Sequence, residues 1–257
     1  MPTELSISIA TVLSFALVLV RVSGVFVFVP LPGFASTPGV ARIILSLGFT
    51  MALFPTWTAL AAVPSTFGQL AGWIAAEATF GLAIGLAVGF ALESFVLGAQ
   101  LLSSQAGYNY ASTIDPTTQA DSTVLVVMAQ LTGGLLFFAL GLDHRVLLAF
   151  ARSIETHPPG SLVIGPSVGF DLIHLSAGIF TTGFRLVLPL MALLLMLDLS
   201  LGLLGRLNAQ LQLMTLAFPV KTLAVLALFS WSVLLFPRSA NSFLETTFQF
   251  IGKLVAP

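Results

Sequence analysis

Four charged side chains stand inside apolar runs of the sequence, where a membrane-spanning helix would place them deep in the hydrocarbon. These candidate buried charges are Arg21, Glu93, Arg185 and Lys221. A charge at that depth costs about 2.5–3.5 kcal/mol on insertion scales, so it is normally kept where it faces protein or water. Such groups relay protons or ions in transporters, but they also pair with other subunits or extend toward the interface. The sequence favours inter-subunit pairs or snorkelling and leaves the relay open.

Catalytic and metal-binding chemistry finds little support in the sequence. Asp143, His144, Glu155 and His157 are metal-ligand types, but their spacing fits no common ligand pattern. The first two, followed by Arg145, are more typical of a solvated membrane boundary. The chain has no cysteine, which excludes thiolate catalysis and cysteine-based metal sites. No nucleotide-binding or nucleophile-elbow fingerprint is present, so we expect no enzyme, no metal and no cofactor.

Three glycines, Gly81, Gly85 and Gly89, recur at every fourth position and therefore lie on one face of a helix. A face with almost no side chain lets another helix approach closely. The spacing predicts close helix packing but does not identify the partner helix. Packing within the chain and contact with a neighbouring subunit both remain open.

The stretch from Gln100 to Ser122 is polar, although almost everything on either side of it is apolar. Gly107 is expected to end the preceding helix, because glycine is the usual residue of that C-terminal turn. Asp115 and Pro116 form a turn starter in which proline forbids helix continuation. The stretch is either a loop outside the membrane or a loop folded into a protein-lined cavity, since irregular backbone is not tolerated against lipid.

The elements that must position these groups are long apolar helices. Hydrophobic residues make up 57% of the 257-residue chain and charged residues only 7%, far below the roughly one quarter of a soluble domain. A period-two alternation typical of barrel strands is missing. A net charge of −1 points to no nucleic-acid partner. We expect about six long helices, over residues 5–29, 43–54, 77–102, 123–142, 172–197 and 213–236, with an amphipathic helix near 146–157 and a polar tail.

The whole chain resembles the flagellar biosynthetic protein R family (FliR) of type III secretion export gates. Each matching fragment is weak alone, but their order and spacing together are specific. The fragments are RVSG from Arg21, PLPGF from Pro30, PGVAR from Pro38, Glu77 with GLAIG from Gly81, QAG from Gln105 followed by Asp115-Pro116, GLDH from Gly141, and FPVK from Phe218.

The resemblance implies an all-α subunit of a hetero-oligomeric helical assembly with P and Q subunits, and with B and A subunits as further partners. Unfolded proteins would cross the bacterial inner membrane through its pore, at the flagellar basal body. The single domain, residues 1–257, would comprise a P-like part over about 1–170 and a Q-like helical hairpin over about 171–257.

The resemblance also places a pore plug in the polar stretch, over about residues 107–122. The plug residues that we single out are Gly107, Tyr108, Asn109, Tyr110, Asp115 and Pro116. Two departures stand out: the turn from Arg206 to Gln212 lacks the proline often found there, and Thr117, Thr118, Gln119 and Asp121 make the plug unusually polar. The alternatives are the equivalent subunit of a virulence injectisome and a stand-alone secondary transporter.

Overall fold

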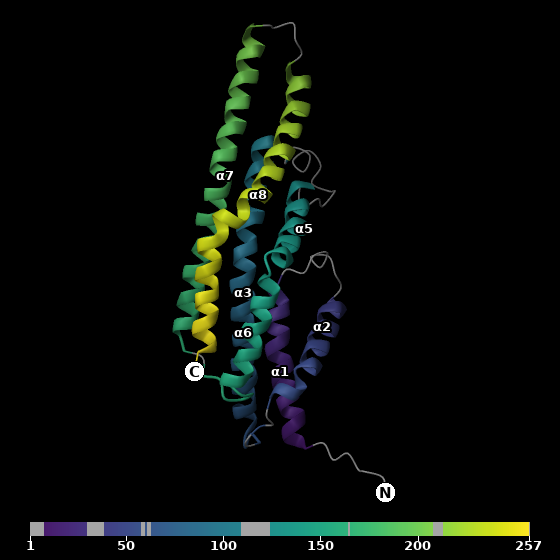
Figure 1. Ribbon diagram of the computed structural model, residues 1–257, viewed down its shortest axis with the longest axis vertical. Coiled ribbons are helices and arrows are strands. Elements are labelled where there is room, and N and C mark those ends of the chain that lie inside the picture. The colour runs from purple at the N-terminus through teal and green to yellow at the C-terminus, as the bar shows by residue number, and fades with distance from the viewer. Residues whose placement is uncertain are drawn as a thin grey trace. The chain divides into compact units, whose positions relative to one another are not determined.

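All regular structure in the described part of the chain is helical (Figure 1), which confirms the expected all-α class. The computed structural model describes residues 8–29, 39–57, 60, 63–108, 124–163, 165–207 and 213–256. The helices are α1 (Ile9–Phe28), α2 (Gly39–Ala52), the short 3₁₀ helix η1 (Phe54–Thr56), α3 (Phe67–Ala106), α5 (Val124–Ala139), α6 (Leu142–Thr156), α7 (Ser167–Leu207) and α8 (Leu213–Val255).

Fewer helices than the expected six are long and apolar enough to cross a membrane. Within the described ranges four qualify, α1, α3, α7 and α8, and a fifth span arises if the bent pair of α5 and α6 counts as one. The 40, 41 and 43 residues of α3, α7 and α8 correspond to roughly 60 Å each at 1.5 Å per residue. That is about twice the thickness of the hydrocarbon core.

The long helices run past the ends that the sequence predicts for them. Helix α3 begins at Phe67 rather than near Glu77, and α8 absorbs the polar tail as far as Val255. Hydroxyl side chains inside these helices bond to their own helix: Thr79 donates to the Ala75 carbonyl at 2.7 Å and Ser232 to the Phe229 carbonyl at 2.6 Å. Polar residues that satisfy themselves in this way do not end a helix.

The helix predicted over residues 123–142 is broken near its C-terminal end. Helix α5 stops at Ala139, and the chain turns by 63° before α6 begins at Leu142. Gly141 takes a left-handed conformation with φ of 65°, which glycine adopts without the steric cost that other residues meet. Helix α6 confirms the amphipathic helix expected in this region.

By their contacts the residues fall into two compact units. Unit 1 comprises residues 1–90, 137–176 and 245–257, and unit 2 comprises residues 91–136 and 177–244. Parts of α3, α7 and α8 therefore belong to each unit. The expected division into P-like and Q-like parts near residue 170 concerns likeness between sequences, which these contacts do not test, and it stays a prediction.

Unit 2 is held by close packing of α3 against the hairpin of α7 and α8. A Cβ added at Gly183 of α7 would lie 2.9 Å from the Ser94 carbonyl of α3, so only a glycine permits this approach. The ring of Phe95 on α3 lies 5.9 Å from that of Phe229 and 5.0 Å from that of Phe236, both on α8. Aromatic packing of this kind stabilises the three-helix core.

Helix α3 ends as the sequence predicts, at Gly107. This glycine has φ of 86°, and its N–H donates to the Ser104 carbonyl while the Tyr108 N–H donates to the Ser103 carbonyl, both at 3.1 Å. The two bonds are those of a Schellman turn, which satisfies the last carbonyls of a helix. The other plug residues, Asn109, Tyr110, Asp115 and Pro116, lie outside the described residues.

Candidate functional site

The main polar site among the described residues is a buried ion pair in unit 1 between Arg21 of α1 and Glu77 of α3. Arg21 Nε lies 2.5 Å from Glu77 Oε2, and Arg21 Nη2 lies 3.0 Å from Glu77 Oε1. Both side chains are fully buried, at 0% exposure. The two parallel bonds match the planar fork of a guanidinium to a carboxylate, which is the strongest common geometry for such a pair.

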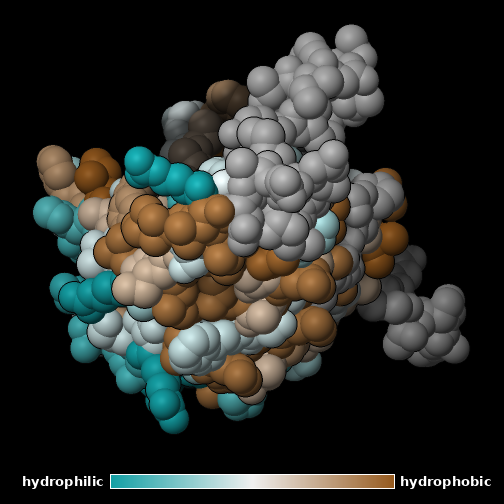
Figure 2. All heavy atoms as spheres, turned by 90° about the horizontal axis from the view of Figure 1, so that it is seen from above, coloured by the Kyte–Doolittle hydropathy of each residue, from teal (hydrophilic) through white to brown (hydrophobic). Residues whose placement is uncertain are grey.

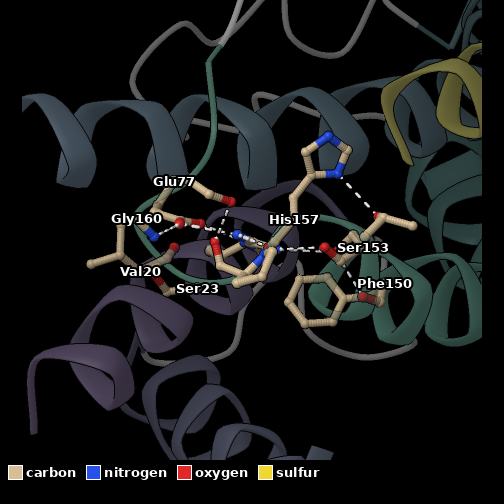
Figure 3. A network of polar contacts seen from close by, with 11 residues as sticks. Val20, Ser23, Glu77, Phe150, Ser153, His157 and Gly160 are labelled. Carbon is tan, nitrogen blue, oxygen red and sulfur yellow. Dashed lines mark hydrogen bonds and ion pairs between the residues drawn. The ribbon is translucent and has the colours of Figure 1, made fainter. Parts of the chain in front are cut away.

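The remaining donors of Arg21 go to Ser153 at the end of α6 and to His157 directly after it, both of which are labelled in Figure 3. Nη1 donates to the Ser153 carbonyl at 3.1 Å and to its hydroxyl at 3.4 Å, and Nη2 donates to the His157 carbonyl at 3.1 Å. A guanidinium has five N–H donors, and these contacts occupy all of them. The arginine therefore has no donor left for a ligand.

The carboxylate of Glu77 is completed by the backbone of Gly160, whose N–H donates to Oε1 at 3.0 Å. Gly160 has φ of 81°, and a Cβ at this position would lie 2.9 Å from Leu60 and 3.2 Å from Trp73. Both conformation and space thus require glycine here. The network joins α1, α3, α6 and the 157–160 segment into one polar cluster with its groups satisfied.

Directly beside the ion pair, α1 and α3 cross with almost no side chain between them. A Cβ on Gly81 would overlap the Arg21 carbonyl, and one on Gly85 would lie 2.7 Å from the Val25 carbonyl. On the opposing helix, a Cβ on Gly24 would lie 2.9 Å from the Leu82 nitrogen. Gly89 is less tightly packed, because a Cβ on it would lie 3.3 Å from its nearest neighbour, the Phe28 carbonyl oxygen. In this chain, α1 occupies the glycine face of α3.

The close crossing and the ion pair support each other. Buried charges are stable only when they are paired and hydrogen-bonded, and the short distance between the backbones brings the Arg21 side chain to Glu77. The pair is shielded from water, and the guanidinium has no free donor for proton transfer. The arrangement can therefore hold segments together, whereas it is not built as a relay.

The other charges singled out from the sequence lie in unit 2. Lys221 of α8 pairs with Asp198 of α7, Nζ to Oδ1 at 2.5 Å, and these side chains are 28% and 30% exposed. Gln105 of α3 adds a long contact to Asp198 at 3.5 Å. Glu93 and Arg185 are exposed, and among the described residues neither has an ion-pair partner.

The weak metal-ligand cluster of the sequence does not assemble. Within the described ranges, no group of three or more histidine and acidic side chains could hold a metal ion. The His157 ring instead shares a hydrogen bond of 3.0 Å with the Thr156 hydroxyl. Burial and the Arg21 charge lower the pKa of His157 below its usual range, against the opposing effect of Glu77.

Sequence reasoning missed Glu77, Ser153 and Gly160 as members of the polar site. It identified Arg21 as a buried charge but took Glu77 only as the beginning of a helix. The missed signal was charge complementarity, since Arg21 and Glu77 are opposite charges in separate apolar runs, and a lone charge at depth requires a partner. Ser153 takes part largely through its backbone and carries no comparable signal.

Apolar helices of this length, with a polar cluster closed to solvent, define a multi-pass all-α membrane protein. Residues 12–247 match the family described as Bacterial export proteins, family 1, and the chain belongs to that family. It is therefore a multi-pass protein of the bacterial inner membrane.

Curated relatives agree in name. The chain is 28% identical over 203 residues to the flagellar biosynthetic protein FliR of Escherichia coli, covering 79% of this chain and 77% of the relative. It is 27% identical over 221 residues to that of Caulobacter vibrioides, covering 85% and 87%. The protein of the same name in Bacillus subtilis is 25% identical over 215 residues, covering 81% of each chain. The resemblance inferred from the sequence fragments is confirmed.

Proposed function

We propose that the chain is a structural, non-enzymatic subunit of the flagellar type III protein export apparatus at the basal body. The observation that carries this proposal is the family match over residues 12–247, with relatives named for flagellar biosynthesis. Together with P and Q subunits, and next to B and A subunits, the chain would form the channel through which unfolded flagellar proteins leave the cell.

The surface of the chain supports a place inside an assembly. Large apolar side chains are exposed on every long helix, and apolar residues cover much of the face in Figure 2. Lipid can cover such a surface, but it cannot neutralise a charge at depth. Glu93 and Arg185 are exposed charges within long apolar helices. We therefore assign both to contacts with other subunits.

Two parts of the chain would then have different tasks. The glycine crossing and the Arg21–Glu77 pair give the P-like part a fixed internal frame, while the hairpin of α7 and α8 supplies the Q-like part. The polar stretch from Gly107 to Ser122 would close the pore. The Schellman turn at Gly107 supports this assignment, because it ends α3 sharply and starts the stretch from a fixed point.

Co-expression tests the assembly most directly. We expect the tagged chain to co-purify in mild detergent with its P and Q partners, because its exposed charges need protein neighbours. Glu93→Gln and Arg185→Gln should weaken co-purification without lowering the yield of the chain, and Glu245→Gln, an exposed acidic residue of unit 1, is the control. A chain that purifies alone as a stable homo-oligomer would instead support the transporter.

Deletion of the gene separates the two export systems. Loss of motility and of hook-protein export, both restored by the gene on a plasmid, would support the flagellar assignment. Intact motility with loss of another secreted protein would support the injectisome instead.

The plug is tested by deleting residues 108–120. The shortened chain should assemble normally but let ions or small solutes pass through the membrane, because the stretch that closes the pore is gone. Assembly without increased leakage would refute the plug.

A further inference from the structure

Unit 1 contains an apolar pocket of about 210 Å³ between α1, α2, the end of α5 and α6. Of the described residues, five phenylalanines, four valines and one leucine line it, together with one charged residue, Asp143. The walls are firm, because the rings of Phe26, Phe49 and Phe150 pack edge to face at centroid distances of 6.0 and 5.8 Å.

Asp143 is a charged residue among those that line this pocket, although the surface inside the pocket is almost entirely apolar. It lies in the first turn of α6 and is half-buried, and no other described residue forms a hydrogen bond or ion pair with its side chain. Nearby Arg145 is engaged elsewhere, with Glu245 at 3.4 Å and over the ring of Phe248 at 3.8 Å. A free carboxylate at the edge of an apolar pocket is suited to an amphiphile with a cationic head.

We propose that the pocket binds one acyl chain of a membrane phospholipid whose ammonium headgroup, as in phosphatidylethanolamine, meets Asp143. An apolar protein cavity of about 150 Å³ binds benzene, so 210 Å³ is room for part of an acyl chain. A partner helix, about 10–12 Å across with its side chains, does not fit. An acyl chain needs no hydrogen bonds, and the lining beyond Asp143 offers none.

The surroundings of the pocket support a lipid in this position. Helix α2 has 14 residues, roughly 21 Å at 1.5 Å per residue, which is too short to cross the hydrocarbon core. Its outer face exposes Ile43, Ile44 and Leu47 at 67%, 63% and 42%. A bound acyl chain would fill the space between this short apolar helix and α6.

Two neighbouring leucines of α6 provide a matched pair for the test. Leu147 lines the pocket and is 39% exposed, whereas Leu148 is 54% exposed and lies outside the lining. The full chain, purified from bacterial membranes in mild detergent with its co-purifying subunits, is analysed by native mass spectrometry for bound phospholipid. Leu147→Trp should lower the occupancy of one tightly bound lipid about tenfold, equivalent to roughly 1.4 kcal/mol, and Leu148→Trp should leave it unchanged.

The headgroup is tested on the delipidated complex with dioleoyl phosphatidylethanolamine and dioleoyl phosphatidylglycerol, which have the same acyl chains. The unchanged protein should prefer the first lipid by about two- to fivefold, as expected for a partly exposed charge pair. Asp143→Asn should remove this preference, and Glu155→Gln, an exposed acid at the other end of α6, should preserve it.

Three results would overturn the proposal. Equal lipid occupancy in Leu147→Trp and the unchanged protein would show that the pocket holds no lipid. Loss of a co-purifying subunit at constant lipid count would show that a side chain of that subunit fills the pocket. A preference for phosphatidylglycerol, or one that survives Asp143→Asn, would refute the headgroup contact.

Discussion

The two ion pairs within apolar helices differ in how completely the chain encloses them. Arg21 and Glu77 in unit 1 are fully buried, and every donor of the arginine is used by residues of the chain. Lys221 and Asp198 in unit 2 remain 28% and 30% exposed. The first pair is complete without a partner protein, while the second remains partly open to its surroundings.

The sharpest way to break this contrast is to remove one member of the enclosed pair. Glu77→Gln leaves the Arg21 charge buried without its partner, which destabilises by about 3–5 kcal/mol. We expect the chain to be lost from membranes, measured by immunoblot and by the melting temperature of the purified complex.

Two variants control this prediction. Glu245→Gln breaks an exposed pair of the same unit, 42% and 53% exposed, and should cost no more than about 1 kcal/mol. The double variant Arg21→Met with Glu77→Leu should recover part of the loss, because it leaves no uncompensated charge. Wild-type stability of Glu77→Gln alone would contradict the structural role of the pair.

The glycine crossing comes next in expected effect. Gly81→Ala places a Cβ against the Arg21 carbonyl, and backbone on both sides cannot yield, so the helices must separate. We expect a loss of about 1–3 kcal/mol, typical of overpacking, measured as a lower melting temperature.

Two glycines of the same helix calibrate that result. Gly89→Ala should cost less, since its nearest contact is at 3.3 Å, and Gly68→Ala meets nothing within 4 Å. The latter should even stabilise α3 slightly, because alanine favours helix by up to about 1 kcal/mol over glycine. Equal effects of Gly81→Ala and Gly68→Ala would show that the crossing is not tight.

The partly exposed pair of unit 2 should respond more weakly. Lys221→Met removes a charge that the chain encloses only in part, and we expect a loss of about 1 kcal/mol or less. A double-mutant cycle with Asp198→Asn, read from melting temperatures, measures the coupling between the two side chains. A coupling energy as large as that between Arg21 and Glu77 would show that the two ion pairs do not differ in strength.

The smallest expected effect is the pH dependence due to His157. Its folded-state pKa is lowered by burial and by Arg21, so the unfolded chain binds the proton more readily. Stability is then full above the unfolded pKa of about 6.5 and declines as the pH falls below it. His157→Gln should flatten the melting temperature between pH 7 and pH 5; an equally steep decline in this variant would assign the effect to another group.

The sequence predicts the helical class and the local features well, but it predicts poorly which residues of different helices contact each other. The helix end at Gly107 could be predicted because it depends on one residue and its neighbours in the sequence. The glycine spacing of α3 revealed a face for close packing, but α1 as its occupant depends on contacts more than fifty residues away. Glu77 was misread for the same reason, because an ion pair is a property of two helices. The boundaries of α3 and α8 were misplaced because the prediction began one helix at Glu77 and ended the other before Pro237, whereas α3 begins at Phe67 and α8 continues through Pro237 to Val255.

The bonds from Arg21 to Ser153 and His157 also place a cation at the C-terminal end of α6, where the partial negative charge of the helix lies. Arg21 is thus a helix cap supplied from a residue 132 positions earlier in the chain. Three of the five N–H donors of Arg21 find their acceptors only on Ser153 and His157. The buried arginine is therefore fully hydrogen-bonded only when α6 is in place, which ties the position of α6 to the pair between α1 and α3.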